Sequence, residues 1–220
     1  MEPTIYKPSI YKGAGIYKIG AEGGGGGRVE IGGKFYSFVK IGSLFWTAQN
    51  LDYIDSNIIL GGTPTYDENA AHAWYYQNNE NEFGWNGKKL GLLYNNLAAE
   101  YLEQNKETIL NGFRVPKEAD FQNLEDTIGQ TDFINKLKSS KYWNNPGIDE
   151  YGFSMVPGGS CSGDTSTPEV WAGIYIQSNI RMITSDNQGK SFRANDNNTY
   201  ELIRFTNPGF GISLRLCKDA

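Results

Sequence analysis

The sequence predicts an α+β fold with small twisted, mostly antiparallel sheets and two main helices, preceded by an extended N-terminal arm. Strand-like segments come first, two segments with helical spacing follow at residues 92–104 and 117–128, and short strand-like segments return after Tyr142. The order of strands, helices and strands is typical of α+β folds. The 27 glycines and 14% aromatic residues favour short strands joined by tight turns.

The first 27 residues differ in composition from the rest of the chain. The triplet Ile-Tyr-Lys occurs three times, at residues 5–7, 10–12 and 16–18, among prolines and glycines that disfavour a helix. An extended segment cannot bury these apolar side chains on itself, so we expect it to pack on a partner, by edge addition or by intertwining with sister chains. A disordered tail is the alternative. The residues of this predicted assembly arm are Ile5, Tyr6, Ile10, Tyr11, Ile16 and Tyr17.

Five consecutive glycines, Gly23 to Gly27, then read as a flexible linker. The sequence therefore divides into an arm and linker at residues 1–27 and a domain at residues 28–220. Burial of the triplets around a symmetry axis predicts a homo-oligomer, with a trimer favoured.

The domain begins with a predicted β-meander. RVEIGGKFYSFVKIGSLFWTAQNL reads as three strands joined by two turns, with alternation across residues 34–41. The polar pair Gln49-Asn50 ends the third strand. There we expect Asn50 to cap a local turn rather than to take part in catalysis, and Trp46 to belong to the core.

Three helices are predicted in the middle of the chain. Residues 92–104 form an amphipathic helix, residues 131–140 a shorter one, and the helix at 117–128 follows Pro116, which suits a first turn. Acidic residues near its start complement the helix N-terminus. The predicted buried positions are Leu93, Leu97, Ala98 and Tyr101 in the first helix and Phe121, Leu124 and Ile128 in the second.

Composition and charge exclude several classes of partner. A net charge of −5 without a cluster of Lys or Arg disfavours nucleic acid, and no stretch approaches the roughly 20 apolar residues of a membrane span. The N-terminus has neither a basic nor an apolar signal region, so we expect no export signal. Two cysteines, Cys161 and Cys217, are too few for a disulfide scaffold, although a single bridge between them is possible.

Little in the sequence favours catalysis or metal binding. His72 is the only histidine, so a multi-histidine metal site cannot be built, and Cys161 in PGGSCSG lacks the strand-to-helix elbow of a nucleophile motif. The carboxylate pairs at 67–68, 80–82 and 149–150 lie in loop-like stretches, where solvated charges are the rule. We expect no enzyme activity, no cofactor and no metal.

Five blocks of the chain resemble a known family. YSFVKIGSLFWTAQNLDY, GLLYNNLAA, NGFRVPKEADFQNLE, LKSSKYWNNPGIDEYGFSMVPGG and GISLRLCKD are similar, in the same order, to the blocks of the Fibrobacter succinogenes major paralogous domain, over about residues 29–219. The resemblance implies a C-type lectin-like fold, related also to formylglycine-generating enzymes. Where many members have a cysteine this chain has Ile109, so the resemblance implies that Cys217 lacks its usual disulfide partner.

The resemblance also bears on ligands. Lectin-like folds bind sugars through calcium at a Trp-Asn-Asp run, but Trp143-Asn144-Asn145 lacks the Asp and precedes the Gly-Phe strand, so a calcium-free module is expected. Late loops form the ligand face in such folds, and here they are rich in hydrogen-bonding side chains; ordinary turn chemistry is the alternative. The predicted ligand surface comprises Asn179, Arg181, Asp186, Asn187, Gln188, Arg193, Asn195, Asp196, Asn197, Asn198 and Tyr200.

Three functions are compatible with these features. The first is a non-enzymatic bacteriophage virion protein of the fibre or adhesin type. Its arm, residues 1–27, would contact other virion proteins, and its domain would recognise a host-surface glycan or protein. The second is a secreted or surface-displayed bacterial protein of the same family. The third, an enzyme of the formylglycine-generating type, is the weakest, because the paired redox cysteines of that chemistry are missing.

Overall fold

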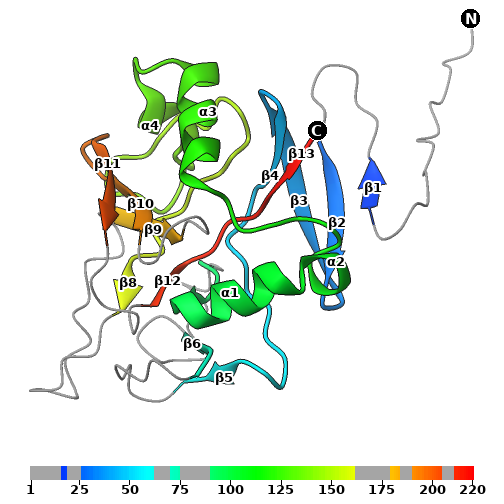
Figure 1. Ribbon diagram of the computed structural model, residues 1–220. Coiled ribbons are helices and arrows are strands. Elements are labelled where there is room, and N and C mark those ends of the chain that lie inside the picture. The colour runs from blue at the N-terminus through cyan, green and yellow to red at the C-terminus, as the bar shows by residue number, and fades with distance from the viewer. Residues whose placement is uncertain are drawn as a thin grey trace, which may run out of the picture.

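The computed structural model describes residues 16–18, 26–61, 70–74, 90–161, 179–183, 190–204 and 211–220 (Figure 1). Its strands form two sheets, and its helices cover them. All but two of the strand pairings are antiparallel, the exceptions being β5–β6 and β9–β12. The predicted α+β class with small, mostly antiparallel sheets is therefore confirmed.

The first sheet is the predicted meander, extended by one strand on each side. Its order is β1-β2-β3-β4-β13, and Gly32 and Gly33 make the β2–β3 turn with positive φ angles of 57° and 79°. These strands are β1 (Ile16–Lys18), β2 (Gly27–Ile31), β3 (Lys34–Ile41), β4 (Leu44–Thr47) and β13 (Cys217–Asp219). The last residues of the chain thus complete a sheet that its first strands begin.

Part of the predicted arm lies in this first sheet. Ile16 stands opposite Val29 and Tyr17 opposite Arg28, so the third Ile-Tyr-Lys triplet pairs with β2 of its own chain. Gly27, the last residue of the predicted linker, is already the first residue of β2. The other arm residues, Ile5, Tyr6, Ile10 and Tyr11, lie outside the described residues.

The second sheet has the order β11-β10-β9-β12-β7-β6-β5, and β8 also pairs with β12. Its strands are β5 (Ile59–Leu60), β6 (His72–Trp74), β7 (Leu93–Tyr94), β8 (Ser160–Cys161), β9 (Asn179–Ile183), β10 (Lys190–Asn195), β11 (Tyr200–Arg204) and β12 (Gly211–Ser213). Figure 1 shows β9 to β11 on one side of the molecule and β1 on the opposite side.

The helices are α1 (Asn96–Gln104), α2 (Lys106–Ile109), α3 (Glu118–Ile128) and α4 (Phe133–Leu137). The first begins four residues later than predicted. Leu93 and Tyr94 form β7 against β12, and the Asn95 side chain then caps α1 by accepting from the Ala98 N–H at 2.9 Å. The apolar residues before Asn95 therefore belong to a strand, which helical spacing alone could not reveal.

The start of α3 also differs from the prediction. Pro116 lies before the helix, and Lys117 is its N-cap residue. The carboxylate of Asp120 accepts from the Lys117 backbone N–H at 2.6 Å and so satisfies one of the free donors of the first turn. The predicted apolar face of α3 is confirmed, because Phe121, Leu124 and Ile128 are buried.

Two hydrophobic cores lie on opposite faces of the first sheet. Tyr36 and Phe38 of β3 enter one core together with α1, whereas Ile41 enters the other with α3 and α4. Successive strand residues face opposite sides of a sheet, so the alternation in β3 serves both cores. Trp46 is fully buried against Phe121 and Phe153, with ring centroids 5.4 and 5.6 Å apart, which confirms it as a core residue.

The two cysteines are both buried and both free. Cys217 lies in the core beneath α3, whereas Cys161 packs with Trp74 and Leu93 in a separate cluster. The possible bridge between Cys161 and Cys217 is therefore not formed. Burial raises the pKa of both thiols, which keeps them protonated.

Candidate functional site

The described residues of the predicted ligand surface lie on the adjacent strands β9, β10 and β11 and in the turn between β10 and β11. Arg193 on β10 stands opposite Arg181 on β9 and Glu201 on β11, and its guanidinium lies 3.2 Å from the Glu201 carboxylate. Asn195 stands opposite Asn179 in the same ladder. Sequence positions up to 16 residues apart (179 and 195) are thus brought side by side. Asp186, Asn187 and Gln188 lie outside the described residues.

The turn between β10 and β11 uses its polar side chains locally. The Asn195 side-chain amide donates to the Thr199 hydroxyl at 3.0 Å, and that hydroxyl donates to the side-chain amide oxygen of Asn197 at 2.8 Å. Asn198 adopts a left-handed conformation with φ of 65°, which Asn tolerates better than most residues. Asn195, Asn197 and Asn198 therefore shape the turn, as the alternative of ordinary turn chemistry anticipates.

Asp196 joins the same turn to the segment that follows α4. Its backbone carbonyl accepts from the Lys138 ammonium at 2.9 Å, and its carboxylate accepts from the Asn145 backbone N–H at 2.8 Å. Lys138 is fully buried, with its nitrogen 5.0 Å from the Trp143 ring centroid. Burial lowers the pKa of Lys138, and the nearby Asp196 opposes that shift. The turn is thus held from below by a buried cation.

The core-facing side of the β10–β11 hairpin is aromatic. Phe192 stacks on Phe121 of α3 with centroids 4.7 Å apart and planes 4° apart. Tyr200, a predicted ligand residue, is half-buried and packs edge-on against Phe133 at 5.0 Å. Burial and the neighbouring Glu125 raise the pKa of Tyr200 to about 12. The hairpin therefore presents Arg193 and Glu201 outward on a support that is packed against α3 and α4.

Sequence reasoning missed the contribution of Lys138 to this region. Lys138 and Asp196 are 58 residues apart, and no periodicity in the sequence connects them. A lysine at the end of a short apolar helix is usually solvated, so only the fold reveals that its ammonium group is buried.

Asn50 has a structural role, but not the predicted one. Its side-chain nitrogen donates to the Leu90 carbonyl at 2.7 Å, and its side-chain oxygen accepts from the Arg215 Nε at 2.8 Å. Both partners are distant in sequence, whereas a local turn cap was expected. The reason is that the chain after β4 runs between the 90–92 segment and Arg215, so Asn50 satisfies groups on both neighbours. Gln49 accepts from the Ser37 N–H at 2.9 Å.

Arg215 is the centre of this buried network, and sequence reasoning missed it. Besides Asn50, its guanidinium donates to the carbonyls of Thr47 at 3.0 Å, Ser154 at 2.8 Å and Phe153. The side chain is fully buried, and its charge lies 4.7 Å from the Phe153 ring centroid. Burial lowers the pKa of Arg215 to about 9, against an opposing effect of Asp149. The network holds three segments of the domain together.

An open pocket of about 340 Å³ lies beside this network. Lys34, Phe35 and Tyr36 of β3 form one wall, and Gln49, Asn50, Asp52 and Gly91 form the rest. The Asp52 carboxylate accepts from the Lys34 ammonium at 2.9 Å and from the Tyr36 hydroxyl. Burial and this carboxylate raise the pKa of Tyr36, so the phenol stays protonated and donates its proton.

The other residues considered for chemistry are placed as follows. His72 on β6 is half-buried and stacks on Trp74 with centroids 5.4 Å apart. The Asp149 carboxylate accepts hydrogen bonds from the Ser154 N–H and hydroxyl at 2.7 and 2.6 Å, so these bonds stabilise a local turn. The carboxylate pairs at 67–68 and 80–82 lie outside the described residues.

The described ranges contain no group of three or more His, Cys, Asp or Glu residues that could hold a metal ion. None of their helices has the length and apolar character needed to cross a membrane.

Comparison with known proteins gives one match. The model of the Fibrobacter succinogenes major domain family matches residues 39–218, a span that begins in β3 and ends in β13. No curated protein and no solved structure matches the chain. The matched span covers well over half of the 220 residues and includes the Arg215 network, the core beneath α3 and α4, and most of the other core. The chain therefore belongs to the Fibrobacter succinogenes major domain family.

Proposed function

We propose that this chain is a non-enzymatic recognition protein of the fibre or adhesin type in a bacteriophage virion. Residues 1–27 join it to sister chains and other virion proteins, and its C-type lectin-like domain recognises a glycan or protein on the host surface. The recognition face is the outward side of β9, β10 and β11 together with the turn at residues 196–199, which connects β10 to β11.

The observation that carries the proposal is the opposite placement of the arm and this face. β1 is the outer strand of the first sheet, whereas β11 is the outer strand of the second. Figure 1 shows the two on opposite sides of the molecule. A chain attached through its N-terminus would therefore direct the recognition face away from the attachment point.

The chemistry of the recognition face agrees with this role. Arg193 and Glu201 supply both donors and acceptors in a partly exposed ion pair. Such mixed groups suit the recognition of a polar surface, and they bind better when the backbone beneath them is already ordered. The Phe121–Phe192 stack and the Lys138–Asp196 bond supply that order.

The recognition role is tested by binding to host cells. The double variant Arg193→Ala/Glu201→Ala should bind at least about tenfold more weakly than the wild type, since one buried interface contact contributes about 1.4 kcal/mol or more. The matched control is Lys40→Ala/Glu150→Ala, which removes one exposed charge of each sign elsewhere and should bind as the wild type does. Equal binding by both double variants would remove β9 to β11 as the recognition face.

The anchoring role is tested by deleting residues 1–21. The truncated protein should remain folded, become monomeric by light scattering, and fail to join its particle, because the assembly arm is gone. The full chain should be a homo-oligomer, with a trimer expected. Assembly of the truncated protein at the native stoichiometry would show that the contact lies on the domain instead.

Family membership favours a second candidate function, that of a bacterial surface or secreted protein, because the family takes its name from a bacterium, Fibrobacter succinogenes. Antibody detection distinguishes the two proposals. The virion proposal requires the chain to co-purify with phage particles through a density gradient. Recovery only in the cell-surface or secreted fraction of a phage-free culture would support the bacterial candidate.

A further inference from the structure

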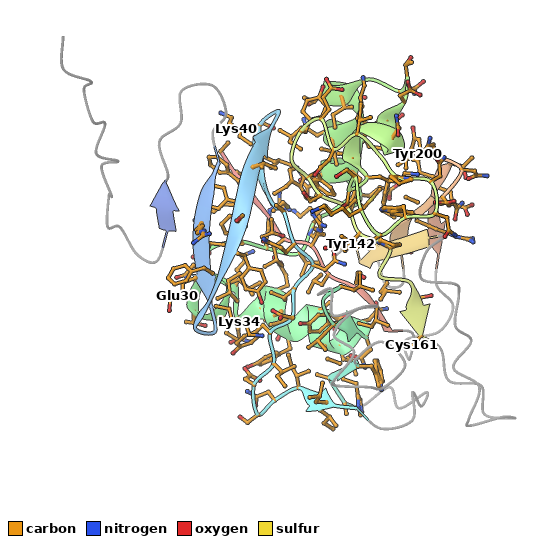
Figure 2. All side chains as sticks on the ribbon, turned by 180° about the vertical axis from the view of Figure 1, so that it is seen from behind. Glu30, Lys34, Lys40, Tyr142, Cys161 and Tyr200 are labelled. Atoms are coloured by element: carbon orange, nitrogen blue, oxygen red, sulfur yellow. The ribbon has the colours of Figure 1, made fainter. Side chains whose placement is uncertain are left out.

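The outer edge of β2 offers a partner strand a short stretch of backbone with a defined end. β1 pairs with residues 27–29 of β2, and Tyr17 stands opposite Arg28. Beyond this stretch the edge is closed, because the Glu30 carbonyl accepts a hydrogen bond from the Asn111 side-chain amide. Figure 2 shows Glu30 near the end of β2, with β1 beside that strand. The open edge therefore has the length of one Ile-Tyr-Lys triplet.

We propose that this edge, residues 27–29, is a triplet slot, and that in the homo-oligomer a sister chain supplies the triplet that fills it. The inference rests on the proposed assembly role of residues 1–27. It adds to that role the part of the domain that receives the arm and the chain from which the arm comes.

Arg28 provides the backbone groups of the triplet slot. It stands opposite Ser37 of β3, but the Ser37 N–H donates to the Gln49 side chain at 2.9 Å. The Ser37 carbonyl accepts from the Ala48 N–H at 2.8 Å. Because antiparallel strands alternate between bonded and non-bonded pairs, the N–H and carbonyl of Arg28 face away from β3 and toward Tyr17. A strand whose middle residue lies opposite Arg28 can bond to both groups.

The chain carries three segments that match the triplet slot. The triplets at residues 5–7, 10–12 and 16–18 have the same sequence, with tyrosine in the middle. The third forms β1, which shows that an Ile-Tyr-Lys triplet can pair with this edge. Strand addition depends mainly on backbone hydrogen bonds, so the two identical triplets should pair in the same way. Both precede β1 in the chain, where they can reach a neighbouring subunit.

The connections on the two sides of β2 differ in how firmly they assign a partner strand. β2 and β3 are joined by the two-residue turn at 32–33, which ties both strands to one chain. β1 and β2 are separated by residues 19–26, which include five glycines. Closing this glycine-rich loop costs more entropy than closing a tight turn, and only the bonds at Arg28 offset it. A sister triplet, held nearby in the oligomer, fills the slot without closing the loop.

The test is disulfide trapping between two chains. Tyr17→Cys is made in one full-length chain and Arg28→Cys in another that is enlarged by a fusion partner, and the two are co-expressed and oxidised. Opposed Cα atoms lie about 5.5 Å apart in a bonded antiparallel pair, which a disulfide can span. We expect a disulfide-linked heterodimer on a non-reducing gel. Tyr6→Cys and Tyr11→Cys are tested in the same way, because the slot accepts any of the three triplets.

The matched control replaces the Arg28→Cys chain with a Lys40→Cys chain. Lys40 is also exposed, but it lies on β3, whose two edges are already paired with β2 and β4. Figure 2 shows Lys40 at the far end of this sheet. The native Cys161 and Cys217 are buried and should not compete. If none of the three tyrosine positions gives more heterodimer than this control, the proposal is overturned.

Proline at residue 28 tests the triplet slot itself. Arg28→Pro removes an N–H that faces the slot, and it leaves the hydrogen bonds between β2 and β3 in place. The association constant of the oligomer should fall at least about fivefold by analytical ultracentrifugation, as expected for the loss of a backbone hydrogen bond. Arg28→Ala keeps the N–H and should assemble as the wild type does. Equal assembly of Arg28→Pro and the wild type would overturn the proposal.

These outcomes can be told apart from those of the proposed anchoring role. Deletion of residues 1–21 asks whether the arm is needed for assembly, whereas disulfide trapping asks which edge receives it and from which chain. Loss of assembly on deletion, without a heterodimer above the control, would leave the anchoring role in place and reject strand exchange alone. Normal assembly of the truncated protein would reject both.

Discussion

The Arg215 network and the Asp196 turn use the same bond type in two different environments. In both, a cationic side chain donates to backbone carbonyls, from Arg215 in the interior and from Lys138 beneath the turn. The acceptors of Arg215 lie on segments up to 168 residues away, and those on Thr47 and Phe153 are buried, whereas Asp196 belongs to a partly exposed turn. Buried acceptors that lose their donor are costly, and those near water are not. The first network should therefore control stability, and the second should control the order of one surface.

The largest effect on the free energy of unfolding is expected at Arg215. Arg215→Met keeps an apolar chain of similar length but leaves the Thr47, Phe153 and Ser154 carbonyls without this donor. We expect a loss of about 3 kcal/mol or more in the free energy of unfolding, measured by urea denaturation. Arg215→Lys, which keeps the charge without the planar fork, should be intermediate. A loss below about 1 kcal/mol for Arg215→Met would mean that the network does not control stability.

Asp120 should show the next largest effect, because it joins α3 to Arg114, whose backbone pairs with Cys217 of the last strand. Its carboxylate binds both terminal guanidinium nitrogens of Arg114 and caps the Lys117 N–H. Burial alone raises the pKa of Asp120, but the bonds from Arg114 and Lys117 outweigh burial and lower it overall. We expect Asp120→Asn to lose about 2 kcal/mol in urea denaturation at pH 7.

The pH dependence gives an independent check on Asp120. Its folded-state pKa lies below the ordinary value of about 3.9, so its ionised form stabilises the fold above that pH. This contribution should disappear as the pH falls through the folded-state pKa. The difference in stability between wild type and Asp120→Asn should therefore shrink below about pH 4. A difference that stays constant down to pH 2 would contradict the ion pair.

The first sheet, α3 and the Arg215 network show where sequence reasoning succeeds and where it fails. The meander and the apolar face of α3 could be predicted, because alternation at 34–41 and the spacing of Phe121, Leu124 and Ile128 are local signals. Asn50 was recognised as structural, but its partners Leu90 and Arg215 could not be found, since they lie 40 and 165 residues away. Long-range polar contacts leave no period in a sequence.

The same limit applies to the candidate sites. Arg193, Asn195 and Asp196 could be listed as a polar surface because they are close in sequence, and the register of β9 and β10 places Arg181 opposite Arg193. Lys138 beneath the turn and the pocket at Asp52 could not be predicted. Each depends on residues from separate elements, which only the packing of the two sheets and their helices brings together.

Lys138 should have a moderate effect, and a local one. Lys138→Met keeps the packing on Trp143 but removes the bond to the Asp196 carbonyl. We expect a loss of about 1 kcal/mol in stability, with faster hydrogen exchange at the Asn195 and Asn198 amides, whose backbone bonds close the turn. Amides in β2 and β3 should exchange as before and serve as the internal control. Acceleration throughout the domain would show that Lys138 belongs to the global fold, as Arg215 does.

The smallest effect on stability is expected at the Arg193–Glu201 pair, which lies on the recognition face. Its atoms are 3.2 Å apart, and the side chains are 30% and 53% exposed, so water competes with each partner for the other's charge. A double-mutant cycle with Arg193→Ala and Glu201→Ala should give a coupling of less than about 0.5 kcal/mol at 0.15 M salt, decreasing further at 1 M. A surface that exchanges its own ion pair for a ligand requires such a weak coupling, because the pair must open when the ligand binds. A coupling above about 1 kcal/mol that resists salt would instead assign the pair to the framework and leave the face without its exchangeable charges.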